Sequence, residues 1–378
     1  MLLSGLLAAV VAVSAPAASG SSAPHLTTTR GGALLMTWME PAGGKKHALK
    51  LATMKNGKWS AARTIAARDD FFVNWADFPS IVEDAKGTLF AHWLQKSAPG
   101  TYTYDVVVTS SRDGGATWTP ARVLHTDGTK TEHGFASMVP LATSGVGVVW
   151  LDGREMSPGD HGHGGGPMTM RYAELDAALK VTKETRVDAR VCECCTTGMA
   201  MTANGPVIAY RDRSESEVRD IGILRRANGT WTAPKLVHND GWKIAGCPVN
   251  GPQLDARGKL VAAAWFTAAN NDPRVYVAFS RDAGATFGPP VRVDSGKSIG
   301  RVEVLLANDG SALVMWVEND DIMLRRVPAN GKPAAPVKVA ATTAARGSGF
   351  PRAALLGNTV YVAWTDATAK RVKLTRVD

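Results

Sequence analysis

The sequence predicts an all-β fold, a β-propeller of four-stranded blades, because one strand recurs, turn signals flank it, and no long segment has helical periodicity. A short apolar strand ends in an aromatic residue seven times, at spacings of 48 to 60 residues. The seven aromatic residues are Trp38, Trp93, Trp150, Tyr210, Trp265, Trp316 and Trp364. A repeat of about 50 residues with four short strands is typical of a propeller blade.

The other strands of each repeat follow in a constant order. A short strand and a Gly-containing turn precede the aromatic-ended strand, whose continuous apolar character predicts burial between neighbouring blades. A polar loop and an alternating strand come next, for example residues 106–110 and 275–280. A fourth strand opened by an aromatic residue and a proline follows in most repeats, as in residues 118–124 and 231–237. The seventh repeat, from about residue 350, lacks a clear fourth strand, which leaves ring closure open.

The turn between the third and fourth strands carries the most specific motif. Residues 111–118 and 280–287 both read S-x-D-x-G-x-T-W/F. Its Asp accepts hydrogen bonds from turn amides, its Gly takes a positive φ, and its aromatic residue packs under the hairpin. The positions concerned are Ser111, Asp113, Gly115, Thr117 and Trp118, and Ser280, Asp282, Gly284, Thr286 and Phe287.

These octapeptides resemble the Asp boxes, or BNR repeats, of the sialidase superfamily. The resemblance implies a propeller whose Asp boxes lie on the face opposite the active site. It also implies six blades, which stay the alternative to the seven repeats counted. The catalytic pattern of a sialidase is not matched: no R-I-P segment occurs, residues 74–79 at the nearest place lack arginine, and no tyrosine sits obviously beside a glutamate. Only the Asp-box positions therefore carry over.

The N-terminus predicts export. Residues 1–22 contain an apolar run followed by small residues near Ala15 to Ala18, as in a secretory signal peptide. The run is interrupted by Ser and Pro and is short for a membrane span, and no later segment is comparable. We therefore expect residues 23–378 to form a single propeller domain that is periplasmic or extracellular and not an integral membrane protein.

The chain is basic, with a formal net charge of +9 at pH 7. This favours an acidic partner, such as an anionic glycan or a cell-envelope component, although a solvated basic surface explains it equally well. No recognisable nucleic-acid-binding module is present, so we expect no nucleic acid partner.

The order of strands in a propeller places the loops on two opposite faces of the ring. Loops between second and third strands, and linkers between blades, share the face opposite the Asp boxes. The unusual residues fall there, in loops 151–163 and 211–220 and in linkers 188–195 and 240–252. One sector around blade four therefore holds all four cysteines and many arginine and carboxylate residues.

The cysteines are Cys192, Cys194, Cys195 and Cys247. In an exported protein they predict two disulfides, at least one of them joining the Cys192–Cys195 group to Cys247. A copper or zinc site is the alternative, with further ligands from His133, His161 or His163, and reactive thiols are a third. No other cofactor is expected.

The charged residues predict either a salt-bridged loop or a ligand pocket. Arginine forks suit carboxylates, and paired carboxylates are the usual machinery of glycoside hydrolysis. The catalytic candidates are Asp152, Arg154, Glu155, Arg211, Asp212, Glu217 and Asp220. The ligand-binding candidates are Trp75 and Trp242 for stacking on a sugar, Asn250, and Arg301 and Arg352, which begin first strands and could point into the central channel.

Three functions follow from these observations. The first is a glycoside hydrolase or lyase that acts on an acidic glycan through the Arg/carboxylate pocket. The second is a non-catalytic ligand- or protein-binding propeller whose disulfides staple its loops. The third is a periplasmic metal-binding protein that uses the cysteines.

Overall fold

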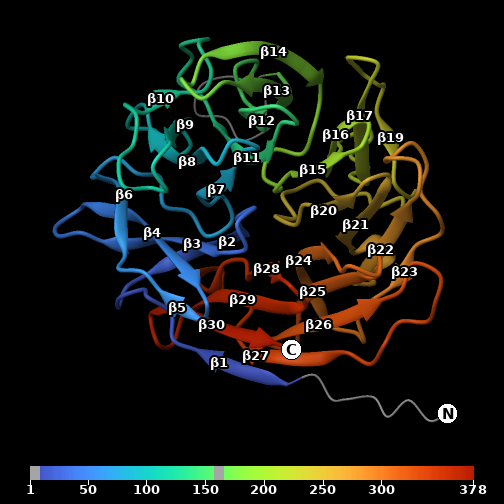
Figure 1. Ribbon diagram of the computed structural model, residues 1–378. Coiled ribbons are helices and arrows are strands. Elements are labelled where there is room, and N and C mark those ends of the chain that lie inside the picture. Colours follow the sequence, from blue (N-terminus) through green and yellow to red (C-terminus); the bar gives the residue numbers. More distant parts are fainter. Residues whose placement is uncertain (1–8, 157–165) are drawn as a thin grey trace.

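The computed structural model describes residues 9–156 and 166–378, which form seven antiparallel sheets arranged as blades around a central axis (Figure 1). The predicted β-propeller and its count of seven repeats are confirmed, and the alternative of six blades is wrong. His161 and His163, named above as candidate metal ligands, lie outside the described residues.

Each blade has four main strands, which follow chain order from the axis outward except that β1 is the outer strand of the seventh blade. The inner strands are β2 (Ser22–Thr28), β7 (Ser80–Glu83), β11 (His133–Pro140), β15 (Gly198–Thr202), β20 (Gln253–Arg257), β24 (Ser298–Leu306) and β28 (Arg352–Leu356). The second strands are β3 (Leu34–Pro41), β8 (Leu89–Lys96), β12 (Val146–Asp152), β16 (Gly205–Arg211), β21 (Leu260–Thr267), β25 (Ala312–Glu318) and β29 (Thr359–Asp366).

The third strands are β4 (His47–Lys55), β9 (Tyr104–Ser111), β13 (Thr169–Leu175), β17 (Ile221–Ala227), β22 (Arg274–Ser280), β26 (Asp321–Val327) and β30 (Arg371–Val377). The outer strands are β6 (Arg63–Arg68), β10 (Arg122–Val123), β14 (Val181–Asp188), β19 (Lys235–Leu236), β23 (Val291–Arg292), β27 (Val337–Ala341) and β1 (Val10–Val13). The short strands β5 (Lys58–Trp59) and β18 (Thr230–Trp231) add hairpins, and the 3₁₀ turns are η1 (Ala269–Asn271) and η2 (Arg346–Ser348).

The hydrophobic core is divided among the interfaces between blades. The described residues form seven apolar clusters, and each cluster joins two neighbouring blades. Trp38 of β3, for example, shares a cluster with Tyr361 and Ala363 of β29. A second strand therefore packs on both of its faces, which explains its continuous apolar sequence.

The buried tryptophans at the ends of the second strands need acceptors for their indole N–H groups. In three blades the acceptor is a carboxylate two residues further on. The N–H to oxygen distances are 2.8 Å for Trp38 to Glu40, 2.7 Å for Trp150 to Asp152 and 2.8 Å for Trp316 to Glu318. Gln95 accepts from Trp93 at 3.5 Å, and the linker residue Asp240 accepts from Trp265 at 2.8 Å. The W-x-D/E pattern thus supplies the indole acceptor in three blades, whereas Asp366 does not accept from Trp364.

Both Asp boxes form as predicted. The carboxylate of Asp113 accepts from the backbone N–H of Ala116 at 3.0 Å and of Thr117 at 2.9 Å. Gly115 has a φ of +85°, and a Cβ atom there would lie 2.6 Å from the side chain of Leu51. Glycine is therefore required both by the backbone conformation and by the close approach of the next blade.

The chain closes the ring with its N-terminus. Strand β1 pairs antiparallel with β30, so that the first described residues supply the outer strand of the last blade (Figure 1). The hydroxyl of Thr375 donates to the carbonyl of Val11 at 2.7 Å. Strand β1 lies within residues 1–22, the predicted signal peptide, and the signal peptide stays a prediction. Cleavage near Ala15 to Ala18 would leave the seventh blade with three strands.

Removal of residues 1–14 should destabilise the protein, because β30 then loses the backbone partners that β1 supplies and becomes an exposed edge. We expect the melting temperature to fall by roughly 5 °C or more. As a control, Val10→Thr with Val11→Thr changes two exposed side chains and keeps the strand, so it should leave melting almost unchanged. Equal melting of the truncated and full chains, followed by circular dichroism, would show that β1 does not close the ring.

Candidate functional site

Asp152 lies at the end of β12 and is fully buried. Besides the indole of Trp150, it accepts from Nε of Arg154 at 2.7 Å. Arg154 also contacts Asp127 at 3.3 Å and Glu184 at 3.0 Å. The structure therefore brings together Asp152 and Arg154, two of the predicted catalytic residues. They form an ion pair that stabilises blade three.

The charged side chains in the loop of blade four form a second network of ion pairs. Glu217 pairs with Arg213 at 2.7 Å and with Arg219 at 2.8 Å. Glu193 of the preceding linker pairs with both arginines, at 2.9 Å from Arg219. These contacts match the salt-bridged loop that the sequence left open as an alternative to a pocket.

Arg211 and Asp220 satisfy backbone groups. The guanidinium of Arg211 is buried, donates to the carbonyls of Asn250, Arg219 and Phe266, and stacks 4.7 Å from the ring centre of Trp242. The carboxylate of Asp220 accepts from the N–H of Gly241 at 2.8 Å and of Trp242 at 2.9 Å. Trp242 itself is buried and packs edge-on against Phe266.

Asp212 is the predicted carboxylate with the most perturbed environment. Burial raises its pKa to about 6, and the nearby charges of Asp188 and Asp220 add to that increase. Its Oδ1 accepts from the N–H of Arg213 at 2.8 Å. Glu155 forms an ion pair with Arg186 at 2.9 Å.

Asn250, Arg301 and Trp75 hold neighbouring loops in place. The side-chain oxygen of Asn250 accepts from the N–H of Arg301 at 2.7 Å. The guanidinium of Arg301 donates to the carbonyl of Gly349 at 2.8 Å and lies 5.2 Å from the ring centre of Trp75. Trp75 is half-buried and stacks on Phe350.

The cysteines of the third linker form a compact cluster. Sγ of Cys192 lies 3.4 Å from that of Cys195 and 3.9 Å from that of Cys194. Cys247, from the next linker, interacts with Cys194. His133 groups elsewhere: its ring stacks on that of His125 at 3.6 Å, among Asp105, Asp127 and Asp152. The predicted disulfides stay a prediction.

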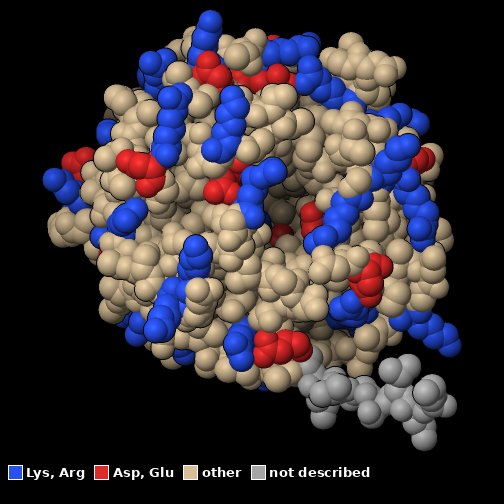
Figure 2. All heavy atoms as spheres, in the orientation of Figure 1, with Lys and Arg blue, Asp and Glu red and all other residues tan. Residues whose placement is uncertain are grey.

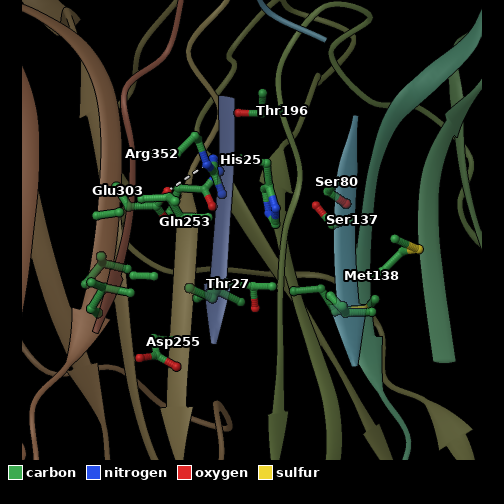
Figure 3. A pocket seen from close by; sticks show the side chains of 18 of the residues that line it. His25, Thr27, Ser80, Ser137, Met138, Thr196, Gln253, Asp255, Glu303 and Arg352 are labelled. Atoms are coloured by element: carbon green, nitrogen blue, oxygen red, sulfur yellow. Dashed lines mark ion pairs between the residues drawn. The ribbon is translucent and has the colours of Figure 1, made fainter. Parts of the chain in front are cut away.

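A cavity of about 410 Å³ occupies the central channel. Seven polar side chains, one from or beside the inner strand of each blade, line it. They are His25, Ser80, Ser137, Thr196, Gln253, Glu303 and Arg352 (Figure 3). Thr27 and Asp255 line the channel further along. Figure 2 shows a hollow near the centre of one face, with basic and acidic side chains at its edge.

Arg352 is the single one of the five predicted ligand-binding residues that lines this cavity. Its Nε lies 2.9 Å from Oε2 of Glu303, and its guanidinium lies 5.1 Å from the ring centre of Phe78. Burial raises the pKa of Glu303, and the charge of Arg352 acts in the opposite direction. Burial lowers the pKa of His25 well below its usual value, with a smaller contribution from Arg352, so the imidazole is neutral at pH 7.

Polar atoms without partners face the same channel. Among the residues that the structure describes, Nδ1 of His25 and Oγ1 of Thr196 are buried and have no hydrogen-bond partner. Buried polar groups are normally satisfied, so these two atoms mark places for a ligand or ordered water. Sequence reasoning missed the ring, because each inner strand contributes one ordinary polar residue with no local motif.

A buried carboxyl group, also missed, adjoins the cavity. Burial raises the pKa of Asp77 to about 8. Asp77 accepts from the N–H of Phe135 at 2.8 Å and lies 3.4 Å from the hydroxyl of Tyr104, which donates to Glu132 at 2.7 Å. The structure thus pairs a tyrosine with a glutamate, but Tyr104 is buried beneath Gly134, where a Cβ atom would lie 2.7 Å from the ring.

Comparisons with known proteins agree with this fold. Residues 43–225 match the family model described as a BNR repeat-like domain. With the seven blades and the two Asp boxes, this match shows that the fold is similar to that of BNR-repeat β-propellers. No curated protein matches the sequence.

Solved structures share the architecture at low identity. A protein of unknown function from Dyadobacter fermentans is 14% identical, with 98% of this chain and 97% of that chain covered and a TM-score of 0.54. The polysaccharide lyase Uly1 is 8% identical, with 100% and 93% covered and a TM-score of 0.55. The Hadza microbial sialidase Hz136 is 14% identical, with 87% and 73% covered and a TM-score of 0.49. At these identities the likeness concerns the fold.

Asp152→Ala should destabilise the protein by about 3 kcal/mol, because it leaves the buried indole of Trp150 without its acceptor and removes one of the three carboxylates paired with Arg154. Glu155→Gln is the control, since it alters only the partly exposed ion pairs with Arg171 and Arg186 and should change the free energy of unfolding by less than about 1 kcal/mol. Urea unfolding measures both. A fully stable Asp152→Ala protein would contradict the anchoring role.

Asp77→Asn should change how stability depends on pH. An acid whose pKa rises on folding stabilises the folded state below its unfolded pKa of 3.8, and that contribution is lost as pH rises through about 8. Wild type should therefore lose stability relative to Asp77→Asn between pH 4 and 8, by roughly 2–5 °C in melting temperature. Asp69→Asn, at an exposed carboxylate, should keep the wild-type profile. Parallel profiles for wild type and Asp77→Asn would contradict the raised pKa.

Proposed function

We propose that the protein binds an acidic carbohydrate in the mouth of its central channel, with Arg352 as the anchor for the carboxylate. The ring of seven polar side chains around the 410 Å³ cavity carries this proposal. A cavity of this size is within the usual range for small-ligand sites.

The composition of the ring supports a carbohydrate ligand. Sugar hydroxyls both donate and accept, and the ring offers hydroxyl, amide and imidazole groups from separate blades. The unpartnered atoms of His25 and Thr196 would gain hydrogen bonds on binding. Phe78 lines the same cavity and supplies an apolar face beside Arg352.

The guanidinium of Arg352 supports an acidic sugar, although Asp255 and Glu303 also line the cavity. The guanidinium of Arg352 is only partly buried and makes one short contact with Glu303, so it retains donors for a carboxylate. By contrast, the arginines of the blade-four loop are already paired with Glu193 and Glu217. The net charge of +9 would favour the approach of an anionic ligand.

Among reactions, β-elimination is the one to test first. A polysaccharide lyase shares this fold, and the cavity combines a neutral imidazole with a guanidinium. In this reaction His25 would remove the proton next to the carboxylate while Arg352 stabilises the negative charge. A double bond would form as the bond to the leaving sugar oxygen breaks, that oxygen would take up a proton from water, and His25 would return its proton to the solvent. Binding without turnover would instead support a non-catalytic glycan-binding propeller.

The proposal includes a location outside the cytoplasm, in the periplasm or beyond. The apolar N-terminus supports it. No helix among the described residues is long and apolar enough to cross a membrane.

Arg352→Gln should weaken binding of a uronic-acid oligosaccharide by about tenfold or more, because it removes the ionic partner of the carboxylate. Binding of a neutral oligosaccharide of equal length should change little. Calorimetry measures both affinities, and ultraviolet absorbance of an unsaturated product detects elimination.

Arg112→Gln is the matched control, because Arg112 is exposed in an Asp-box turn. Wild-type protein that binds neither class of oligosaccharide would overturn the proposal. Equal weakening of uronate binding by Arg112→Gln and Arg352→Gln would show that attraction is general and not located in the channel.

A further inference from the structure

We propose that Cys192, Cys194 and Cys195 bind a soft metal ion, Cu(I) or Zn(II), and that Cys247 completes the ligand set for zinc. This site lies in the linkers around blade four and is independent of carbohydrate binding in the channel.

The spacing of the sulfur atoms is that of ligands sharing one ion. The three Sγ atoms lie within 4.8 Å of one another, with separations of 3.4 and 3.9 Å from Cys192. A metal–sulfur bond of about 2.3 Å places neighbouring sulfurs about 3.8 Å apart in a tetrahedral site and about 4.0 Å apart in a trigonal one. Three mutually adjacent thiols exceed what one disulfide uses, because a disulfide joins two.

The backbone of the cluster is held by two blades. The N–H of Val191 donates to the carbonyl of Met168 at 2.9 Å, and the N–H of Cys192 donates to that of Arg211 at 3.0 Å. Cys192 and Cys195 are buried, and Cys194 is half-buried. The ligands are therefore positioned by the residue before β13 and by β16 before an ion arrives, which lowers the entropy lost on binding.

Cys247 comes from the other linker beside blade four. It is exposed and lies between β19 and β20 in the sequence, so it would join the three clustered sulfurs as a fourth ligand from a separate segment. A tetrahedral zinc ion would bind all four thiolates, whereas a trigonal copper ion needs only the three of the first linker. Zinc would therefore join the two linkers that flank blade four, whereas copper would bind within the first linker.

Arg219 supports the negative charge of a thiolate site. Its Nη1 lies 3.2 Å from Sγ of Cys192 and also donates to Glu193 at 2.9 Å. Hydrogen bonds from such neighbours orient metal ligands and tune their affinity. Each thiol that binds the ion releases its proton to solvent.

The test uses the full chain, purified without oxygen in the presence of reductant. It is titrated with Cu(I) against bicinchoninate and with Zn(II) against pyridylazoresorcinol, and free thiols are counted with Ellman's reagent. We expect one ion per chain, with three thiols protected by copper or four by zinc. Failure to compete for either metal, or thiols that stay equally reactive with metal present, would overturn the proposal.

Variants separate the ligands from their surroundings. Cys195→Ser should abolish stoichiometric binding, and Arg219→Met should lower affinity about tenfold. Cys247→Ser should weaken zinc about tenfold and leave copper within about threefold, since only zinc needs the fourth ligand. His238→Gln, in the same linker as Cys247, is the control and should bind as wild type does. If Cys195→Ser does not fold, the number of thiols that metal protects in the wild-type protein still tests the proposal.

Discussion

A tryptophan indole buried between two blades must find an acceptor for its N–H, and this requirement decides where several carboxylates of the structure go. Glu40, Asp152 and Glu318 each stand two residues after a buried tryptophan and accept from it. Trp59, Trp118 and Trp364 are exceptions, because their indole nitrogens have no partner among the described residues. An unpaired polar group in an apolar core costs about 1–3 kcal/mol, so these acceptors are part of the packing.

This constraint changes how the polar face is interpreted. Carboxylates at strand ends look like catalytic groups in a sequence, but Asp152 is committed to Trp150 and Arg154, and Asp220 is committed to backbone amides. The groups that remain free to bind a ligand lie elsewhere in the structure. The channel ring has polar atoms without partners, and the cysteine cluster has sulfurs spaced as metal ligands. Chemistry is therefore expected where side chains are not already satisfied by the fold.

The architecture could be predicted because its signals are local and repeated. The aromatic-ended strand and the Asp box each lie within about eight residues, and their recurrence predicted seven blades. Ring closure could not be predicted: residues 10–13 are apolar in a way that also fits a signal peptide, and their partners in β30 lie at the other end of the chain. The channel ring was missed for the same reason, since its members are separate in sequence. The recurrence of W-x-D/E would have identified Asp152 as an indole acceptor.

The central claim is that ligand binding takes place in the channel, beside Arg352, and not over the paired arginines of blade four. A crystal structure of the protein with a uronic-acid oligosaccharide tests it most directly. We expect a sugar carboxylate at the guanidinium of Arg352, with hydroxyls at His25 and Thr196. A sugar seated on the loop of residues 211–220, with the channel holding only solvent, would contradict it.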